Sequence, residues 1–174
     1  MEKGILKRII ASSMFFLAAA CGSASLRDTA EAARAAREAI AIAPERGRIN
    51  GLGIGSSEAE VVAAFGPPAR VEKGFDEIEG KPARTVLYEG IEIYLAGDEI
   101  YYLTCRARNC VTHDGIRVGD TIEKVLAVFG KGRPEQLDDG TEILRYPFAH
   151  ADVALIFTLK DGKLIELELW FDYA

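Results

Sequence analysis

The chain has 174 residues, and its 27 acidic side chains outnumber its 21 basic ones, which gives a formal net charge of −6. No basic stripe runs along the sequence, so the surface repels phosphate backbones, and the composition argues against a nucleic-acid partner.

The first 20 residues have the composition of a secretory signal peptide. Three basic residues, Lys3, Lys7 and Arg8, precede an apolar stretch, 9–20, that is too short to span a bilayer. Removing 20 of the 174 residues, among them three basic and one acidic, leaves 154 residues with a formal net charge of −8. That length allows one domain of ordinary size or two small ones.

Cys21 is the candidate lipidation site. The segment Leu17-Ala18-Ala19-Ala20-Cys21 resembles a bacterial lipobox, in which the cysteine after the cut receives a lipid such as palmitate. The leucine stands one position further from the cysteine than is usual, so an ordinary signal-peptidase cut and an unmodified cysteine stay open as alternatives. By analogy with known lipoproteins, Gly22 favours an outer-membrane anchor facing the periplasm; a secreted or free periplasmic protein is the alternative.

Residues 21–48 are expected to form a tether between the lipid and the folded part. The run LRDTAEAARAAREAIAIAPERGR is rich in Ala, Glu and Arg, which favour helix, and Pro44 stops it. The apolar content is mostly alanine, so this helix has little to bury. A helix packed loosely on the domain is the alternative interpretation.

The rest of the chain contains an internal repeat. The stretch GLGIGSSEAEVVAAFG, 51–66, returns 64 positions later as GIRVGDTIEKVLAVFG, 115–130. Self-similarity at a fixed spacing marks structural units that pack on each other. We therefore expect two tandem repeats, 49–110 and 111–174.

Each repeat is expected to begin with a short helix that ends at a glycine. Ser56 or Ser57 in the first copy and Asp120 in the second supply N-cap oxygens, and the spacing to Glu60 and Glu123 is that of a capping box. The residues expected to face the core are Val61, Val62 and Phe65 in one helix and Val125, Leu126 and Phe129 in the other.

Alternating apolar stretches after each helix predict an antiparallel meander. The expected strands are 70–77, 83–88, 91–95 and 99–105 in the first repeat, and 134–137, 142–146, 152–159 and 163–173 in the second. The first copy also has a longer loop, 73–82. Units of about 60 residues are marginal alone, so the two are expected to share a core or a sheet. The predicted fold class is α+β.

The helix signature resembles that of a known family. The positions that carry it are Gly55, Val61, Phe65, Gly66 and Pro67, and again Gly119, Val125, Phe129, Gly130 and Pro134. The pattern is similar to the helix of the BamE (SmpA/OmlA) lipoproteins and of beta-lactamase inhibitor protein, which carries two such units. The resemblance implies a fold that binds proteins, in an outer-membrane assembly machine or against a secreted enzyme. BamE has one unit and the inhibitor has no lipid, so no specific partner carries over.

Two cysteines, Cys105 and Cys110, bracket the junction between the copies. In an exported protein such a pair most simply forms a disulfide. A metal or redox pair is the alternative, but a metal needs further ligands, and His113 is the only nearby candidate. We expect no metal and no cofactor.

The sequence offers few candidates for a catalytic site. His113 and His150 lie on different expected loops, and no serine stands in a GxSxG elbow, so we expect surface histidines and no catalytic residues. The glycines of the sequence GLGIG, 51–55, precede a helix as in phosphate-binding loops. The second copy has Arg117 at the middle glycine, which indicates that the outer two glycines shape the start of the helix.

The faces of the strands give the functional hypothesis. In the last strand Ile165, Leu167, Leu169 and Phe171 are expected in the core, with Asp172 on the opposite face. The tentative protein-binding residues, on the face away from the core, are Glu92, Tyr94, Tyr102, Glu166, Glu168 and Trp170. Exposed aromatic and polar side chains of this kind are enriched at protein contacts, although an ordinary solvated sheet face has the same pattern.

The sequence therefore predicts a non-enzymatic lipoprotein of the cell envelope that acts as a protein-binding or assembly module. It would reach the membrane through its N-terminal lipid, and an envelope protein is the expected partner. A protein inhibitor, with 73–82 as its protruding loop, or a periplasmic ligand-binding protein is the first alternative. A hydrolase or metal enzyme is the second.

Overall fold

The computed structural model describes residues 31–32, 34–35 and 40–171. The expected signal segment, Cys21 and most of the expected tether helix lie outside these residues, as does Asp172. Residues 31–32 and 34–35 are helical. In the described part of the chain, we find no helix that is both long enough and apolar enough to cross a membrane.

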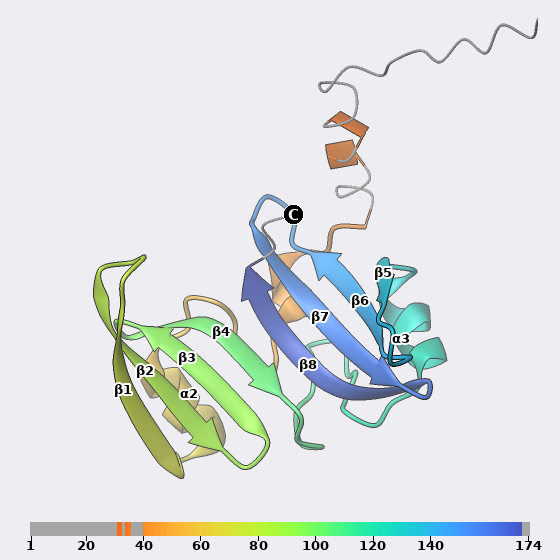
Figure 1. The fold of residues 1–174 in the computed structure, drawn as a ribbon. Coiled ribbons are helices and arrows are strands. Elements are labelled where there is room, and N and C mark those ends of the chain that lie inside the picture. Colours follow the sequence, from red (N-terminus) through yellow and green to blue (C-terminus); the bar gives the residue numbers. More distant parts are fainter. Residues whose placement is uncertain (1–30, 33, 36–39, 172–174) are drawn as a thin grey trace, which may run out of the picture.

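The fold from residue 40 onward is α+β (Figure 1). A short 3-10 helix precedes two α-helices, and each α-helix is followed by four strands. In chain order the elements are η1 Pro44–Gly47, α2 Glu58–Phe65, β1 Arg70–Asp76, β2 Lys81–Tyr88, β3 Ile91–Ala96, β4 Glu99–Cys105, α3 Ile122–Phe129, β5 Arg133–Gln136, β6 Glu142–Pro147, β7 Val153–Lys160 and β8 Lys163–Phe171.

All eight strands belong to one antiparallel sheet with the order β1-β2-β3-β4-β8-β7-β6-β5. The two four-strand halves meet where β4 pairs with β8, and this junction places Leu103 opposite Leu169 and Thr104 opposite Glu168. The green and blue halves of Figure 1 meet along this pair of strands. Of the two expected arrangements, a shared core or a shared sheet, the structure has one sheet that runs through both halves.

One face of the sheet carries the hydrophobic core. Val61 of α2 and Val125 of α3 are fully buried in the same cluster as Ile93, Leu103 and Leu169 of the strands. Because both helices contribute to a cluster on one side of the sheet, the opposite side has neither α-helix packed on it. We call that side the open face.

The start of α2 agrees with the sequence prediction, whereas the start of α3 does not. Ser57 is the N-cap of α2 and forms a capping box with Glu60. The N-cap of α3 is Thr121, which makes no side-chain capping bond, so the prediction of Asp120 was wrong. The Asp120 carboxylate instead accepts hydrogen bonds from the backbone N–H of Arg117, at 2.8 Å, and from Nζ of Lys124, at 2.7 Å.

The prediction that Val62 faces the core was also wrong. Its side chain is 41% exposed, whereas Val61, Val125 and Phe129 are buried. Successive helical residues point about 100° apart, and a helix of two turns presents only a narrow stripe to the sheet. Val61 occupies that stripe, so Val62 turns to the outside.

A β-bulge changes which residues of β8 face the core. The register moves from Thr158 opposite Glu166 to Leu159 opposite Leu164, so Ile165 is an extra residue. An extra residue reverses the alternation of faces. Leu164 is therefore buried and Ile165 is 44% exposed, which makes the core prediction for Ile165 wrong.

The other expected core positions of β8, Leu167 and Leu169, are fully buried, which confirms those predictions. For Phe171 the structure describes the backbone alone. An equivalent register shift leaves Tyr101 as an extra residue between β3 and β4.

Residues 73–82 do not form a loop. They are the end of β1, a turn and the start of β2, with Gly74 opposite Ala83 and Asp76 opposite Lys81. The hairpin they close projects from the sheet at the upper left of Figure 1. The prediction of a loop failed because the strand pairing runs further than the turn residues suggest.

The two halves share one detailed contact between helix and sheet. The rings of Phe65 and Tyr88 pack at 5.4 Å and 49°, and those of Phe129 and Tyr146 at 5.3 Å and 48°. Each tyrosine hydroxyl donates to the carbonyl of the glycine that ends its helix, at 3.0 and 2.7 Å. Burial raises the pKa of Tyr146 to about 12.

The glycines before the two helices confirm their structural role. Gly51 and Gly55 have φ values of 81° and 82°, and Gly115 and Gly119 have 83° and 98°. These angles are strained for residues with a Cβ. Gly53 is not among the residues with positive φ, which explains why another residue can stand at the middle position of the second copy.

A disulfide joins Cys105 at the end of β4 to Cys110, as predicted. Both cysteines are fully buried, with their Cα atoms 6.3 Å apart. Ile42 bridges to Phe148, and the guanidinium of Arg46 bonds to Asp114 at 2.6 Å. The last residues of the 21–48 range thus pack on the second half.

Candidate protein-binding face

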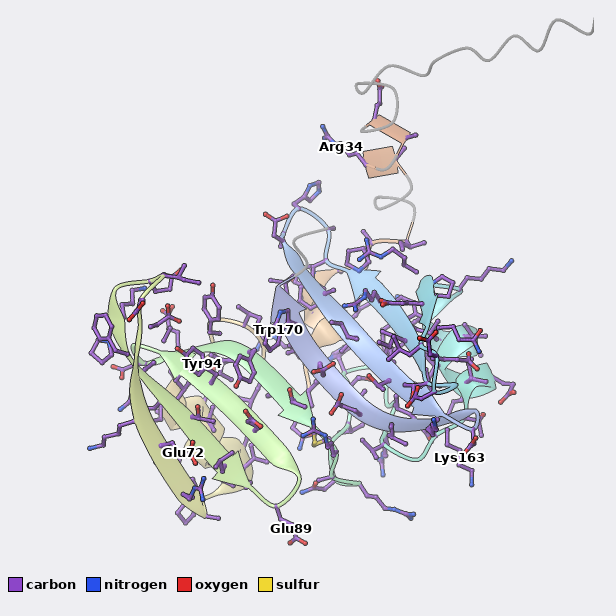
Figure 2. All side chains as sticks on the ribbon, viewed as in Figure 1. Arg34, Glu72, Glu89, Tyr94, Lys163 and Trp170 are labelled. Atoms are coloured by element: carbon purple, nitrogen blue, oxygen red, sulfur yellow. A yellow bond between two sulfur atoms is a disulfide. The ribbon has the colours of Figure 1, made fainter. Side chains whose placement is uncertain are left out.

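Three aromatic side chains form a row across β3, β4 and β8 on the open face. Tyr94 is paired with Tyr102 across β3 and β4, and their rings stack at 5.2 Å with an interplanar angle of 3°. The ring of Tyr102 lies 4.7 Å from that of Trp170 on β8. Trp170 stays 42% exposed. Figure 2 labels Tyr94 and Trp170 on either side of the junction between the two halves. We call these residues the aromatic row.

A row of polar side chains lies next to the aromatic row, two residues along each strand. Glu92 is opposite Thr104, and Thr104 is opposite Glu168. Because side chains two residues apart on a strand share a face, these residues also lie on the open face. The Thr104 hydroxyl donates to Glu168 at 3.4 Å. We call these three residues the polar row.

Hydrogen bonds from the tyrosines hold the aromatic row in place. The Tyr94 hydroxyl donates to Oδ2 of Asp76 at 3.0 Å, and the Tyr102 hydroxyl donates to Oε1 of Glu92 at 2.9 Å. The pKa of both tyrosines is raised, chiefly by burial and to a smaller extent by the carboxylate that each hydroxyl contacts. Both therefore stay protonated donors at neutral pH.

The surroundings of Glu168 disfavour its charged form. Burial in the middle of the sheet raises its pKa, and the nearby carboxylate of Glu166 adds to this effect. Thr104, Arg106 and Arg145 act in the opposite direction. Arg106 forms a salt bridge with Glu166 at 2.5 Å. Glu168 therefore carries its negative charge at some energetic cost.

The open face becomes apolar toward β7. Trp170 is opposite Ala154, and Glu168 is opposite Ile156. Ala154 and Ile156 are both buried although they lie on the face away from the core. Of the six tentative binding residues, five belong to the two rows, and Glu166 lies on the same face because it is two residues from Glu168 on β8.

Asp76 is part of this region, and the sequence analysis missed it. Its Oδ1 accepts hydrogen bonds from the backbone N–H groups of Ile78 and Glu79 at 3.0 and 2.9 Å, while Oδ2 binds Tyr94. These hydrogen bonds lower the pKa of Asp76; the bond from Glu79 has the largest effect, and those from Tyr94 and Ile78 have smaller ones. An aspartate that begins a turn ending in Gly80 is a known signal for such side-chain bonding.

The turn that Asp76 organises carries exposed apolar side chains. Phe75 is 60% exposed and Ile78 is 89% exposed. The hydrogen bonds of Asp76 connect this hairpin to Tyr94 at the end of the aromatic row. The hairpin and the open face are thus parts of one connected surface.

The structure does not bring the two histidines together. His113 is exposed and its backbone N–H donates to the carbonyl of Arg48. His150 lies in the β6–β7 turn and lines a pocket of about 420 Å³ with Phe148 and Asp152, a pocket that His113 does not line. Within the described residues, no group of three or more His, Cys, Asp and Glu could hold a metal ion.

Comparisons with known proteins give distant matches. No protein-family model and no curated protein matches the chain. Among solved structures, it is similar to an extracellular SCP-domain protein from Bacillus anthracis at 12% identity, with a TM-score of 0.44, over 68% of this chain and 44% of that one. The chain thus spans less than half the length of that protein.

Two further solved structures match with lower TM-scores. A DUF4309 family protein from Bacillus subtilis is 17% identical over 70% of this chain and 82% of its own, with a TM-score of 0.38. A candidate beta-lactamase inhibitor protein from Streptococcus mutans is 14% identical over 75% and 90%, with a TM-score of 0.29. These similarities are too distant to place the chain in a family.

Proposed function

We propose that this chain is a non-enzymatic lipoprotein of the cell envelope that binds another protein through its open face. The observation that carries the proposal is the aromatic row, in which Trp170 stays exposed beside two stacked tyrosines. Large rigid rings bury much area for a small loss of side-chain entropy, so such clusters dominate the energy of many protein interfaces.

The proposal includes two tandem helix-plus-sheet repeats of the kind seen in BamE-like proteins. Two observations support the repeats. The ring contacts of Phe65 with Tyr88 and of Phe129 with Tyr146 match at the ends of α2 and α3. The bulges at Tyr101 and Ile165 are 64 positions apart. The aromatic row spans the junction between the halves, so both repeats contribute to the proposed binding surface.

Site-specific crosslinking in intact cells tests the binding function. A photoreactive phenylalanine analogue replaces Tyr102 in one variant and Ala127, an exposed residue on α3, in the control. We expect a protein adduct with the first variant and none with the second. The same adduct from both variants, or no adduct from either, would show that the open face is not the binding surface.

The lipid anchor has a separate test. Labelled palmitate should be incorporated into the wild-type chain and not into a Cys21→Ser variant. Absence of label from the wild-type chain would remove the lipoprotein part of the proposal without affecting the binding face.

A protein inhibitor of a secreted enzyme is the second candidate. The projecting hairpin favours it, because Phe75 and Ile78 expose apolar side chains at a tip that a carboxylate stabilises. An inhibitor should lose affinity for its enzyme in a Phe75→Ser/Ile78→Ser variant and keep it when Trp170 is changed. A partner that binds the open face should show the opposite pattern.

A further inference from the structure

We propose that the open face takes an arginine side chain of its protein partner, held over the aromatic row and paired with a carboxylate of the polar row. This inference rests on the proposed function and names the chemistry that the face recognises. It follows from the rings, the unpaired charges and the spacing of the two rows.

The aromatic row suits a flat cation. The ring of Trp170 is tilted by 32° against that of Tyr102 and keeps 42% of its surface exposed, so part of the indole stays accessible. Tryptophan is the aromatic side chain that binds cations best, and a guanidinium group stacks on it by its planar face. An ammonium group lacks this plane, which favours arginine over lysine.

The carboxylates of the polar row have no salt-bridge partner within the described residues. Within the described residues, Glu92 bonds to the hydroxyl of Tyr102 and Glu168 to that of Thr104, and neither forms a salt bridge. The two arginines whose charge acts on Glu168 form their salt bridges elsewhere: Arg106 binds Glu166, and Arg145 binds Glu135 at 3.1 Å. A cation from outside the chain would therefore relieve this local excess of negative charge.

The spacing of the rows allows one side chain to reach both. Residues two apart on a strand are separated by roughly 7 Å, and neighbouring strands by roughly 5 Å. Glu168 and Trp170 are two residues apart on β8, and Glu92 and Tyr94 are two apart on β3. A guanidinium over the exposed part of the Trp170 ring can therefore donate to the carboxylate of Glu168 beside it, and such charge-assisted bonds are strong.

Trp170 is the only tryptophan of the chain, so its fluorescence reports binding directly. The probe is a nine-residue Gly/Ser peptide with three arginines, and the matched control carries citrulline, which has nearly the same shape without the charge. We expect the arginine peptide to change the emission of Trp170. The citrulline peptide should bind at least about tenfold more weakly, and higher salt should weaken binding of the arginine peptide.

Variants of the polar row test the charge pairing. Glu168→Gln keeps the shape of the side chain and should weaken binding of the arginine peptide by about tenfold, the effect of losing one charge-assisted bond. Glu92→Gln should weaken it less, because β4 lies between Glu92 and the strand that carries Trp170. Glu45→Gln removes an exposed carboxylate of η1 and should leave the affinity unchanged. Equal binding of both peptides, or unchanged affinity in both polar-row variants, would overturn the inference.

The result can be separated from that of the proposed function. If crosslinking at position 102 captures a partner whose attached segment contains no arginine, this inference fails and the binding function stands. If the peptide binds with the expected charge dependence and crosslinking yields no adduct, the cation site stands and the proposed protein-binding function fails.

Discussion

Opening the disulfide between Cys105 and Cys110 should destabilise the protein without abolishing its fold. The bridge joins residues 5 positions apart in sequence, at the end of β4 where the two halves of the sheet meet. In the chain-entropy model the stabilisation grows with the logarithm of the loop length. A closed loop of about six residues corresponds to about 2 kcal/mol at 25 °C.

Urea unfolding with and without a reductant measures this quantity. Both samples carry Cys21→Ala, so that the bridge is the only thiol chemistry present. With a slope of about 2 kcal/mol per molar urea for a chain of this size, the midpoint should fall by about 1 M on reduction. A variant that also carries Cys105→Ala and Cys110→Ala should not respond to the reductant.

Two results would refute the reasoning. An unchanged midpoint, with mass spectrometry showing that the bridge has opened, would mean that closing the loop contributes no stability. Complete unfolding on reduction would mean that the bridge holds the two halves together and does more than restrict the unfolded chain.

Three further predictions concern helix capping, charge and packing. Ser57→Ala should lower the free energy of unfolding, measured in urea, by about 1 kcal/mol, and Thr121→Ala should lower it much less, because only Ser57 makes a side-chain capping bond. Equal losses would contradict this difference between the two N-caps. Glu168→Gln should raise the thermal midpoint at pH 7 and leave it unchanged at pH 3. The raised pKa of Glu168 means that its contribution to stability is complete below its ordinary value of 4.5 and is lost as the pH rises through the folded value, so a pH-independent gain would refute this. Gly47→Ala should lower the free energy of unfolding by about 1 to 3 kcal/mol, because its Cβ would lie 2.1 Å from the ring of Phe148. The Cβ of Gly74→Ala meets open space, so this variant should be close to neutral. Similar unfolding midpoints for both variants would contradict this.

The sequence was sufficient wherever a local rule decides the structure. Gly51 and Gly55 need positive φ, and Ser57 stands at the right distance from Glu60, so the start of α2 could be derived from short-range chemistry. The disulfide followed from two cysteines at a turn in a chain that its sequence predicts to be exported. The strands after each helix were predicted within a few residues of their ends.

The failures arose where tertiary contacts decide between local options. Asp120 has the chemistry of an N-cap, but Lys124 and the backbone of Arg117 engage its carboxylate. The burial of Leu164 and exposure of Ile165 depend on a bulge between two strands, which a single sequence does not mark. Asp76 binds Tyr94 across 18 positions, so its place beside the aromatic row becomes visible only in the fold.

The junction between β4 and β8 also affects how the chain folds. Hairpins such as β1–β2 and β7–β8 connect neighbouring segments, whereas Leu103 and Leu169 on either side of the junction are far apart in sequence. Contacts of long sequence separation carry the greater entropic cost of loop closure and form slowly. Tyr102 and Trp170 come from the two sides of this junction, so their contact requires that the two halves are docked. A partly folded chain, or one in which the halves have separated locally, therefore lacks the complete aromatic row and with it the proposed binding surface.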